Sequence, residues 1–131
     1  MRALVVEDDP CIREVLEIVL DQDGYEVRTA SNGRKALEIL GDWQPVVILL
    51  DLMMPVLDGR GFRAEQLRDA HLAPIPVIVL SAANDVRQQA NTMGAAACLQ
   101  KPFDADQLLA TVRSLTAVRN LHKPAQAGIV Y

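Results

Sequence analysis

Short aliphatic runs alternate with helical patterns along this chain. Three of the runs, Ala3–Val6, Val46–Leu50 and Val77–Leu80, are nearly continuous and rich in valine and isoleucine. Such runs are typical of strands buried on both faces, as in a parallel sheet covered by helices. Two weaker runs, Glu26–Ala30 and Ala97–Gln100, complete a set of five predicted strands.

The segments between these strands carry the apolar spacing and the end signals of helices. The first helix has one apolar stripe, at positions i, i+3, i+4 and i+7, formed by Ile12, Val15, Leu16 and Val19. Asp9 is its predicted N-cap and Pro10 its first residue. Ser31 is the predicted cap of a second helix that ends at Leu40. Three further helices are predicted at Arg60–Asp69, at Asn84–Met93 and from Asp104 onward.

Five strands alternating with five helices predict one α/β domain with right-handed crossovers and a mostly parallel sheet. The 131 residues, half of them hydrophobic, match the length of one ordinary domain. We expect this domain to occupy residues 1–121. The segment His122–Tyr131 has no periodicity and contains Pro124 and Gly128, which indicates a flexible C-terminal tail or the stub of a linker.

Charge and composition narrow the possible functions. The net charge is −4, and the acidic excess lies in residues 1–65, which carry 13 acids and seven bases. Because this balance provides no basic surface for a phosphate backbone, direct nucleic-acid binding is not expected. The aliphatic runs are too short to span a bilayer, and acids follow the first run at once, unlike in a signal peptide. We therefore expect a cytoplasmic protein whose two cysteines are free thiols.

Polar side chains directly follow four of the predicted strands. Ligands of open α/β sheets bind beyond the carboxyl ends of the strands. That edge receives Glu7, Asp8 and Asp9 after the first strand, Asp51 after the third, Ser81 after the fourth and Lys101 after the fifth. Taken singly, Asp51 could cap a turn, Ser81 could cap a helix and Lys101 could be a surface lysine. Their joint placement at four strand ends favours a functional site.

The acids at this edge predict a metal site and a nucleophile. Close carboxylates repel one another, and a shared Mg²⁺, which prefers carboxylate, water and phosphate oxygens, relieves that repulsion. Glu7, Asp8 and Asp51 fit this site, whereas Asp9 is interpreted as a helix cap alone. Asp51 could accept a phosphoryl group as an aspartyl phosphate. Lys101 would then pair with carboxylate or phosphate, and the Ser81 hydroxyl would donate to a phosphate oxygen.

Through these residues the sequence resembles a receiver domain of a two-component response regulator. The matching motifs occur in family order over about residues 2–120: LVVEDDP at Leu4–Pro10, ASNGRKAL at Ala30–Leu37, VVILLDLMMPVLDG at Val46–Gly59, PVIVLSA at Pro76–Ala82 and GAAACLQKPFD at Gly94–Asp104. The resemblance implies a flavodoxin-like fold, with a doubly wound five-stranded parallel sheet in the order 2-1-3-4-5 flanked by five helices.

The resemblance also implies a role for each site residue. Asp51 would be the phosphoacceptor. Mg²⁺ would be held by Asp8, Asp51 and the backbone carbonyl of Met53, with Glu7 acting through water. Ser81 would be the switch hydroxyl, and Lys101, after which a cis peptide bond to Pro102 is implied, would meet the phosphoryl group. Cys98 stands where many receivers carry a tyrosine or phenylalanine that swings inward during switching; we interpret it as a small buried thiol.

The family further implies partners and a mode of output. The phosphoryl donor would be a histidine kinase or a histidine phosphotransfer protein. Output would pass through the face made by the fourth helix, fifth strand and fifth helix, in a monomer or a phosphorylation-dependent dimer. Such a domain is a signalling module that promotes only its own phosphorylation and dephosphorylation, rather than an enzyme.

Three functional interpretations stay open at this point. The chain could be a stand-alone receiver, or a receiver taken from a longer DNA-binding regulator or hybrid histidine kinase. Met1, directly before the first strand, disfavours the hybrid kinase. The chain could also be an aspartyl-phosphate phosphotransferase or phosphatase. That interpretation is the weakest, because Met53 stands where a second aspartate would act as acid and base.

Overall fold

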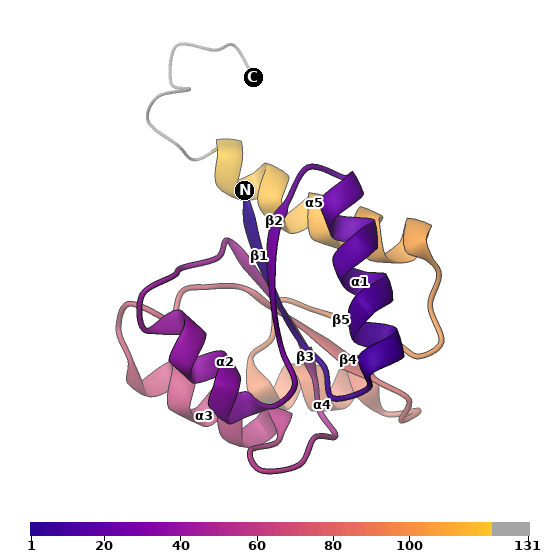
Figure 1. Cartoon of the computed structure of the whole chain (residues 1–131). Helices are drawn as coiled ribbons and strands as arrows, with labels where there is room; N and C mark the ends of the chain where they lie inside the picture. Colours follow the sequence, from indigo (N-terminus) through magenta and orange to yellow (C-terminus); the bar gives the residue numbers. More distant parts are fainter. Residues whose placement is uncertain (122–131) are drawn as a thin grey trace.

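Five parallel strands form one sheet in the order β2-β1-β3-β4-β5 (Figure 1), which confirms the order implied by the resemblance. The computed structural model describes residues 1–121, so the predicted tail lies outside the described residues. The strands are β1 (Arg2–Val6), β2 (Glu26–Ala30), β3 (Val47–Asp51), β4 (Val77–Ser81) and β5 (Ala97–Gln100). The helices are α1 (Pro10–Gln22), α2 (Gly33–Leu40), α3 (Gly59–Arg68), α4 (Val86–Met93) and α5 (Ala105–Leu121).

Helices cover both faces of the sheet, with α1 and α5 on one face and α2, α3 and α4 on the other (Figure 1). Side chains of β1 alternate between the two resulting apolar clusters. Leu4 and Val6 pack toward Phe62 of α3, whereas Ala3 and Val5 pack into the cluster that holds Leu108 of α5. Both sides of the strand are therefore buried, which explains the continuous aliphatic runs of the sequence.

Tertiary contacts fix two helix starts differently from the sequence prediction. The cap of α2 is Asn32, not Ser31; its side chain accepts a hydrogen bond from Lys35 N at 2.9 Å. The next residue, Gly33, donates from its N–H to Leu57 O at 3.0 Å, and a Cβ there would lie only 2.7 Å from that oxygen. This close approach fixes the backbone of Gly33 against Leu57, and α2 begins at Gly33.

The fourth helix begins at Val86, two residues later than predicted. The side chain of Asn84 accepts a hydrogen bond from Gln100 Nε2 at 3.1 Å, so it links the loop after β4 to the end of β5 rather than opening the helix. By contrast, the predicted N-cap Asp9 of α1 is confirmed, because its side chain accepts hydrogen bonds from Cys11 N and Ile12 N.

A buried polar network joins α3 to the C-terminal end of α4, and sequence patterns gave no sign of it. Arg63, only 8% exposed, donates from Nε to Met93 O at 3.0 Å and from Nη2 to Gly94 O at 2.9 Å. Its Nη1 donates to Gln66 Oε1 at 2.8 Å. The guanidinium thus satisfies carbonyls at the negative end of the α4 dipole, although burial lowers its pKa.

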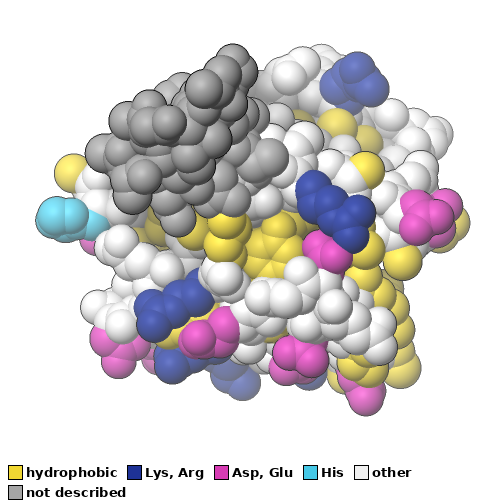
Figure 2. Space-filling view, turned by 90° about the horizontal axis from the view of Figure 1, so that it is seen from above, with side chains coloured by type: hydrophobic (Ala, Val, Ile, Leu, Met, Phe, Trp, Pro, Cys, Tyr) yellow, Lys and Arg dark blue, Asp and Glu magenta, His cyan; other side chains and the backbone are white. Residues whose placement is uncertain are grey.

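On the face in Figure 2, basic and acidic side chains are interspersed rather than gathered into a basic patch. Within residues 1–121, no helix combines the length and the apolar character that crossing a membrane requires.

We expect Arg63→Met to lower the free energy of unfolding by about 3 kcal/mol, because it keeps an apolar stem but leaves buried carbonyls without a donor. Urea unfolding measures the change. Arg68→Met is the matched control. The side chain of Arg68 is 77% exposed and forms a surface ion pair with Glu65, so a loss of less than about 1 kcal/mol is expected. Equal effects of the two substitutions would contradict the role given to the network.

Candidate functional site

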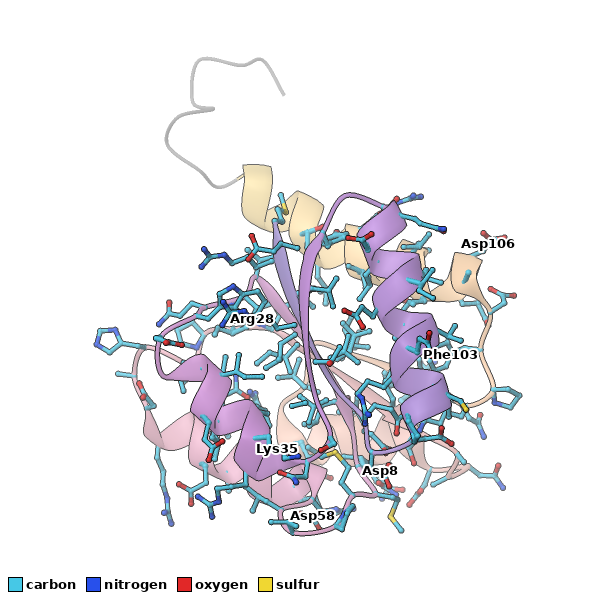
Figure 3. All side chains as sticks on the ribbon, viewed as in Figure 1. Asp8, Arg28, Lys35, Asp58, Phe103 and Asp106 are labelled. Carbon is cyan, nitrogen blue, oxygen red and sulfur yellow. The ribbon has the colours of Figure 1, made fainter. Side chains whose placement is uncertain are left out.

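The carboxyl ends of the strands bring the predicted site residues together. Asp51, the last residue of β3, lies opposite Leu80 of β4, and Ser81, the last residue of β4, lies opposite Gln100 of β5. Lys101 follows directly, and its peptide bond to Pro102 is cis, as the resemblance implied. Figure 3 shows Asp8 at this lower end of the sheet, where the chain leaves β1.

Three carboxylates form a tight cluster at this edge. Glu7, Asp8 and Asp51 each offer one oxygen, and these oxygens all lie within 4.8 Å of one another. Glu7 is fully buried and Asp51 is 3% exposed, whereas Asp8 is more open to solvent. Lys101 Nζ donates to Glu7 Oε1 at 2.6 Å and lies 3.4 Å from Asp51 Oδ1. One ammonium therefore faces three carboxylates, which leaves the cluster with excess negative charge.

Burial and repulsion from neighbouring acids both disfavour the charged form of Asp51. Burial, followed by its contacts with Glu7 and Asp8, raises the pKa of Asp51 to about 7, although Lys101 acts in the opposite direction. Burial alone would also raise the pKa of Asp8, but contacts with Asp51 and Glu7, assisted by Lys101, hold that pKa below its usual value. The proton that relieves the repulsion is thus held on Asp51.

The donor set of this cluster fits a magnesium ion. Hard carboxylate oxygens are the protein ligands that Mg²⁺ prefers, and the excess negative charge favours a divalent cation over a proton. Asp51 also caps a turn, as the sequence allowed, because its Oδ1 accepts a hydrogen bond from Met53 N at 3.3 Å. A turn cap and a metal ligand are compatible roles for a carboxylate with two oxygens.

Ser81 lies in the site, and in this conformation it organises the loop after β4. Its hydroxyl oxygen accepts a hydrogen bond from Ala83 N at 3.1 Å, and its carbonyl accepts one from Lys101 N at 2.8 Å. The hydroxyl proton remains available to donate to a phosphate oxygen.

The cysteines differ slightly from the sequence interpretation. Both are free thiols, as expected, and Cys11 is exposed. Cys98, predicted to be a small buried thiol, is partly buried: it lies on β5, the edge strand of the sheet, and packs against the apolar cluster that includes Ala90 of α4.

Sequence reasoning missed one residue beside the acids. Arg13 of α1 donates from Nη1 to Glu7 O at 2.9 Å and to Asp8 O at 3.4 Å. Its signal in the sequence is weak, because an arginine in the second turn of a helix is usually a solvated surface residue.

The chain matches the family model of the response regulator receiver domain over residues 3–113. RpaA of Synechocystis sp., described as a DNA-binding dual master transcriptional regulator, is 39% identical over 116 residues, which are 87% of this chain and 48% of that protein. The chain therefore spans about half the length of the curated relatives it matches.

Two solved structures show the same fold. The signal receiver domain of a signal transduction histidine kinase from Syntrophus aciditrophicus has a TM-score of 0.83 at 30% identity, covering 94% of this chain and 95% of that one. The receiver domain of sensor histidine kinase PA1611 from Pseudomonas aeruginosa, solved with a magnesium ion coordinated in its active site cleft, has a TM-score of 0.81 at 28% identity. That alignment covers 88% of this chain and 97% of the other.

The raised pKa of Asp51 predicts an unusual pH dependence in metal-free buffer. Asp51 keeps its proton to about pH 7 in the folded protein but only to about pH 3.8 when unfolded. Its stabilising contribution is therefore complete below pH 4 and is lost as the pH rises through 7, by up to about 4 kcal/mol. Asp51→Asn should remove this loss, so the stability difference between variant and wild type should grow from pH 4.5 to pH 7.5.

Urea unfolding with a chelator at both pH values measures this difference. Asp42→Asn, at an exposed position, is the control and should follow the wild type. A difference between Asp51→Asn and wild type that stays constant with pH would contradict the raised pKa.

Proposed function

Because the chain belongs to the response regulator receiver domain family, we propose that it accepts a phosphoryl group on Asp51 from a phosphohistidine. The donor would be a histidine kinase or a histidine phosphotransfer protein. The observation that carries this proposal is the position of Asp51: a buried carboxylate at a strand end, clustered with two other acids and 3.4 Å from the Lys101 ammonium.

The proposed chemistry assigns a task to each polar group. A carboxylate oxygen of Asp51 forms a bond to phosphorus while the bond from phosphorus to the histidine nitrogen breaks, which gives an aspartyl phosphate and a free histidine. Lys101 already contacts Asp51 and offers its ammonium to the incoming phosphoryl oxygens. Ser81 donates its hydroxyl proton to another of these oxygens.

Residues for a magnesium ion surround the same carboxylate. Asp8, Asp51 and the Met53 carbonyl would hold Mg²⁺ directly, and Glu7 would act through water. When bound, Mg²⁺ neutralises negative charge on the transferring phosphoryl group. The closeness of the three carboxylates supports this assignment.

The proposed output is a change of surface rather than turnover of a substrate. Ser81 leads into the loop before α4, and Lys101 leads toward α5, so both can act on the face made by α4, β5 and α5. This face would bind an output protein, or a second copy of the chain after phosphorylation. Because Cys98 replaces an aromatic side chain, we expect the change mainly in the loop Ser81–Asp85 and in α4. The proposed location is the cytoplasm.

A second candidate is the receiver part of a longer DNA-binding regulator. The coverage of about half of each curated relative, and the DNA-binding name of the Synechocystis protein, favour it. In that case the nucleic-acid contacts would lie in a separate domain, which agrees with the mixture of basic and acidic side chains on the face in Figure 2. The coding sequence after codon 131 in the native gene would decide between the two candidates.

We expect acetyl phosphate with Mg²⁺ to add one phosphoryl group to the wild-type chain, seen as an increase in intact mass. Asp51→Asn should remain unmodified, because an amide does not act as the acceptor. Asp58→Asn is the control: Asp58 caps α3 through Gly61 N and should not be needed for acceptance. Full phosphorylation of Asp51→Asn would overturn the proposed acceptor.

Hydrogen exchange should locate the change of surface. With beryllofluoride, a phosphoryl mimic, and Mg²⁺, protection is expected to change in the loop Ser81–Asp85 and in α4, because the Ser81 hydroxyl would leave Ala83 N for the mimic. Helix α2, which α3 separates from α4, serves as the internal reference for unchanged exchange. A change confined to α1 and α2 would contradict the proposed output face.

A further inference from the structure

The loop that carries Glu7 and Asp8 is held by the side chain of Arg13, which has no role in the proposed chemistry. Arg13 Nη1 donates to the main-chain oxygens of Glu7 and Asp8, at 2.9 and 3.4 Å. Glu7 N still donates to Ala30 O of β2 at 3.0 Å, but both carbonyl oxygens lie beyond Val6, the last residue of β1. Arg13 therefore supplies the hydrogen bonds to the backbone carbonyls that follow the end of β1.

Other contacts in this loop hold different atoms. Glu7 Oε1 accepts from Lys101 and Glu7 Oε2 from Asp9 N at 3.3 Å, so the Glu7 side chain is fixed by its carboxylate. Asp9 holds the start of α1. The carboxylate of Asp8 contacts the carboxylates of Asp51 and Glu7 and its own backbone. We therefore expect its direction to follow the orientation of the Asp8 backbone, whose carbonyl oxygen Arg13 contacts.

The charge of Arg13 acts in the opposite direction to its hydrogen bonds. A second cation beside the cluster repels a divalent ion and would weaken its binding. The hydrogen bonds orient a ligand carboxylate and would strengthen binding, as residues that hold metal ligands do. Removing the Arg13 side chain therefore strengthens Mg²⁺ binding if its charge has the larger effect, and weakens it if its hydrogen bonds do.

We propose that Arg13 is a positioning residue for the acid pair, and that its hydrogen bonds to the Glu7 and Asp8 carbonyls raise the affinity of the site for Mg²⁺ despite its positive charge. This inference rests on the proposed function, in which Asp8 is a direct ligand. It differs from a purely structural role, which would stabilise the protein equally with and without the ion.

Titration calorimetry with Mg²⁺ alone, at low ionic strength, tests the inference in three variants. Arg13→Gln removes the charge and is expected to raise the Kd for Mg²⁺ about tenfold, the low end for a residue that holds a metal ligand. Arg13→Lys keeps the charge without the guanidinium geometry and should lie between wild type and Arg13→Gln. Arg87→Gln removes the same charge from an exposed position on α4 and should leave the Kd unchanged.

A kinetic measurement separates positioning from direct catalysis. With acetyl phosphate, Arg13→Gln should be slow at low Mg²⁺ but should approach the wild-type rate at saturating Mg²⁺, because Arg13 contacts main-chain oxygens rather than Asp51. A rate that stays low at saturating Mg²⁺ would overturn the inference.

The outcomes distinguish failure of the inference from failure of the proposed function. Unchanged or tighter Mg²⁺ binding by Arg13→Gln, with a wild type that binds the ion and is phosphorylated on Asp51, overturns the role of Arg13 alone. A wild type that does not bind Mg²⁺ overturns the metal site of the proposed function and the inference with it.

Discussion

The ion pair between Lys101 and the buried Glu7 is the contact on which the site depends. Its two atoms come from residues 94 positions apart, and they meet at 2.6 Å beside Asp51. Burying charges is costly, and pairing offsets this cost only where geometry is good and the remaining oxygens find donors. One ammonium serves two of three carboxylates here, so the cluster keeps an unmet demand for positive charge. Such an excess of negative charge attracts a cation, whereas an ion pair whose charges balance does not.

The sheet and its tight loops supply the rigidity that this cluster needs. Buried apolar clusters on both faces hold β1, β3 and β4 in register, which sets the separation of the strand ends. The loop after Asp51 is equally constrained: a Cβ on Gly59 would lie 2.7 Å from the Asp51 carbonyl oxygen. Val56 in this loop has a φ of 69°, a strained conformation for a β-branched residue. Strain at such a place persists because the surrounding contacts determine the backbone.

The two ends of α4 are held very differently. Arg63 fixes the C-terminal end with two hydrogen bonds from a buried guanidinium. The N-terminal end follows a loop held by the exposed contact between Gln100 and Asn84 and by the hydroxyl of Ser81. This asymmetry supports the expectation that a phosphoryl group, by recruiting Ser81, moves the beginning of α4 more than its end.

The sequence by itself determined the fold class and most of the site, because both follow from local patterns. Aliphatic runs identify buried strands, and the rule that ligands bind at strand ends selects Asp51 and Lys101 without knowledge of their contacts. Only the tertiary structure decided where α2 begins, that Arg63 lies buried, and that Arg13 holds the acid loop. It also decided the raised pKa of Asp51. The start of α2, the burial of Arg63 and the pKa of Asp51 arise from contacts between segments distant along the chain, which the periodicity of the sequence does not reveal. The Arg13 contact spans only five and six residues, but it depends on the direction in which the chain turns from β1 into α1, and periodicity does not specify that direction either.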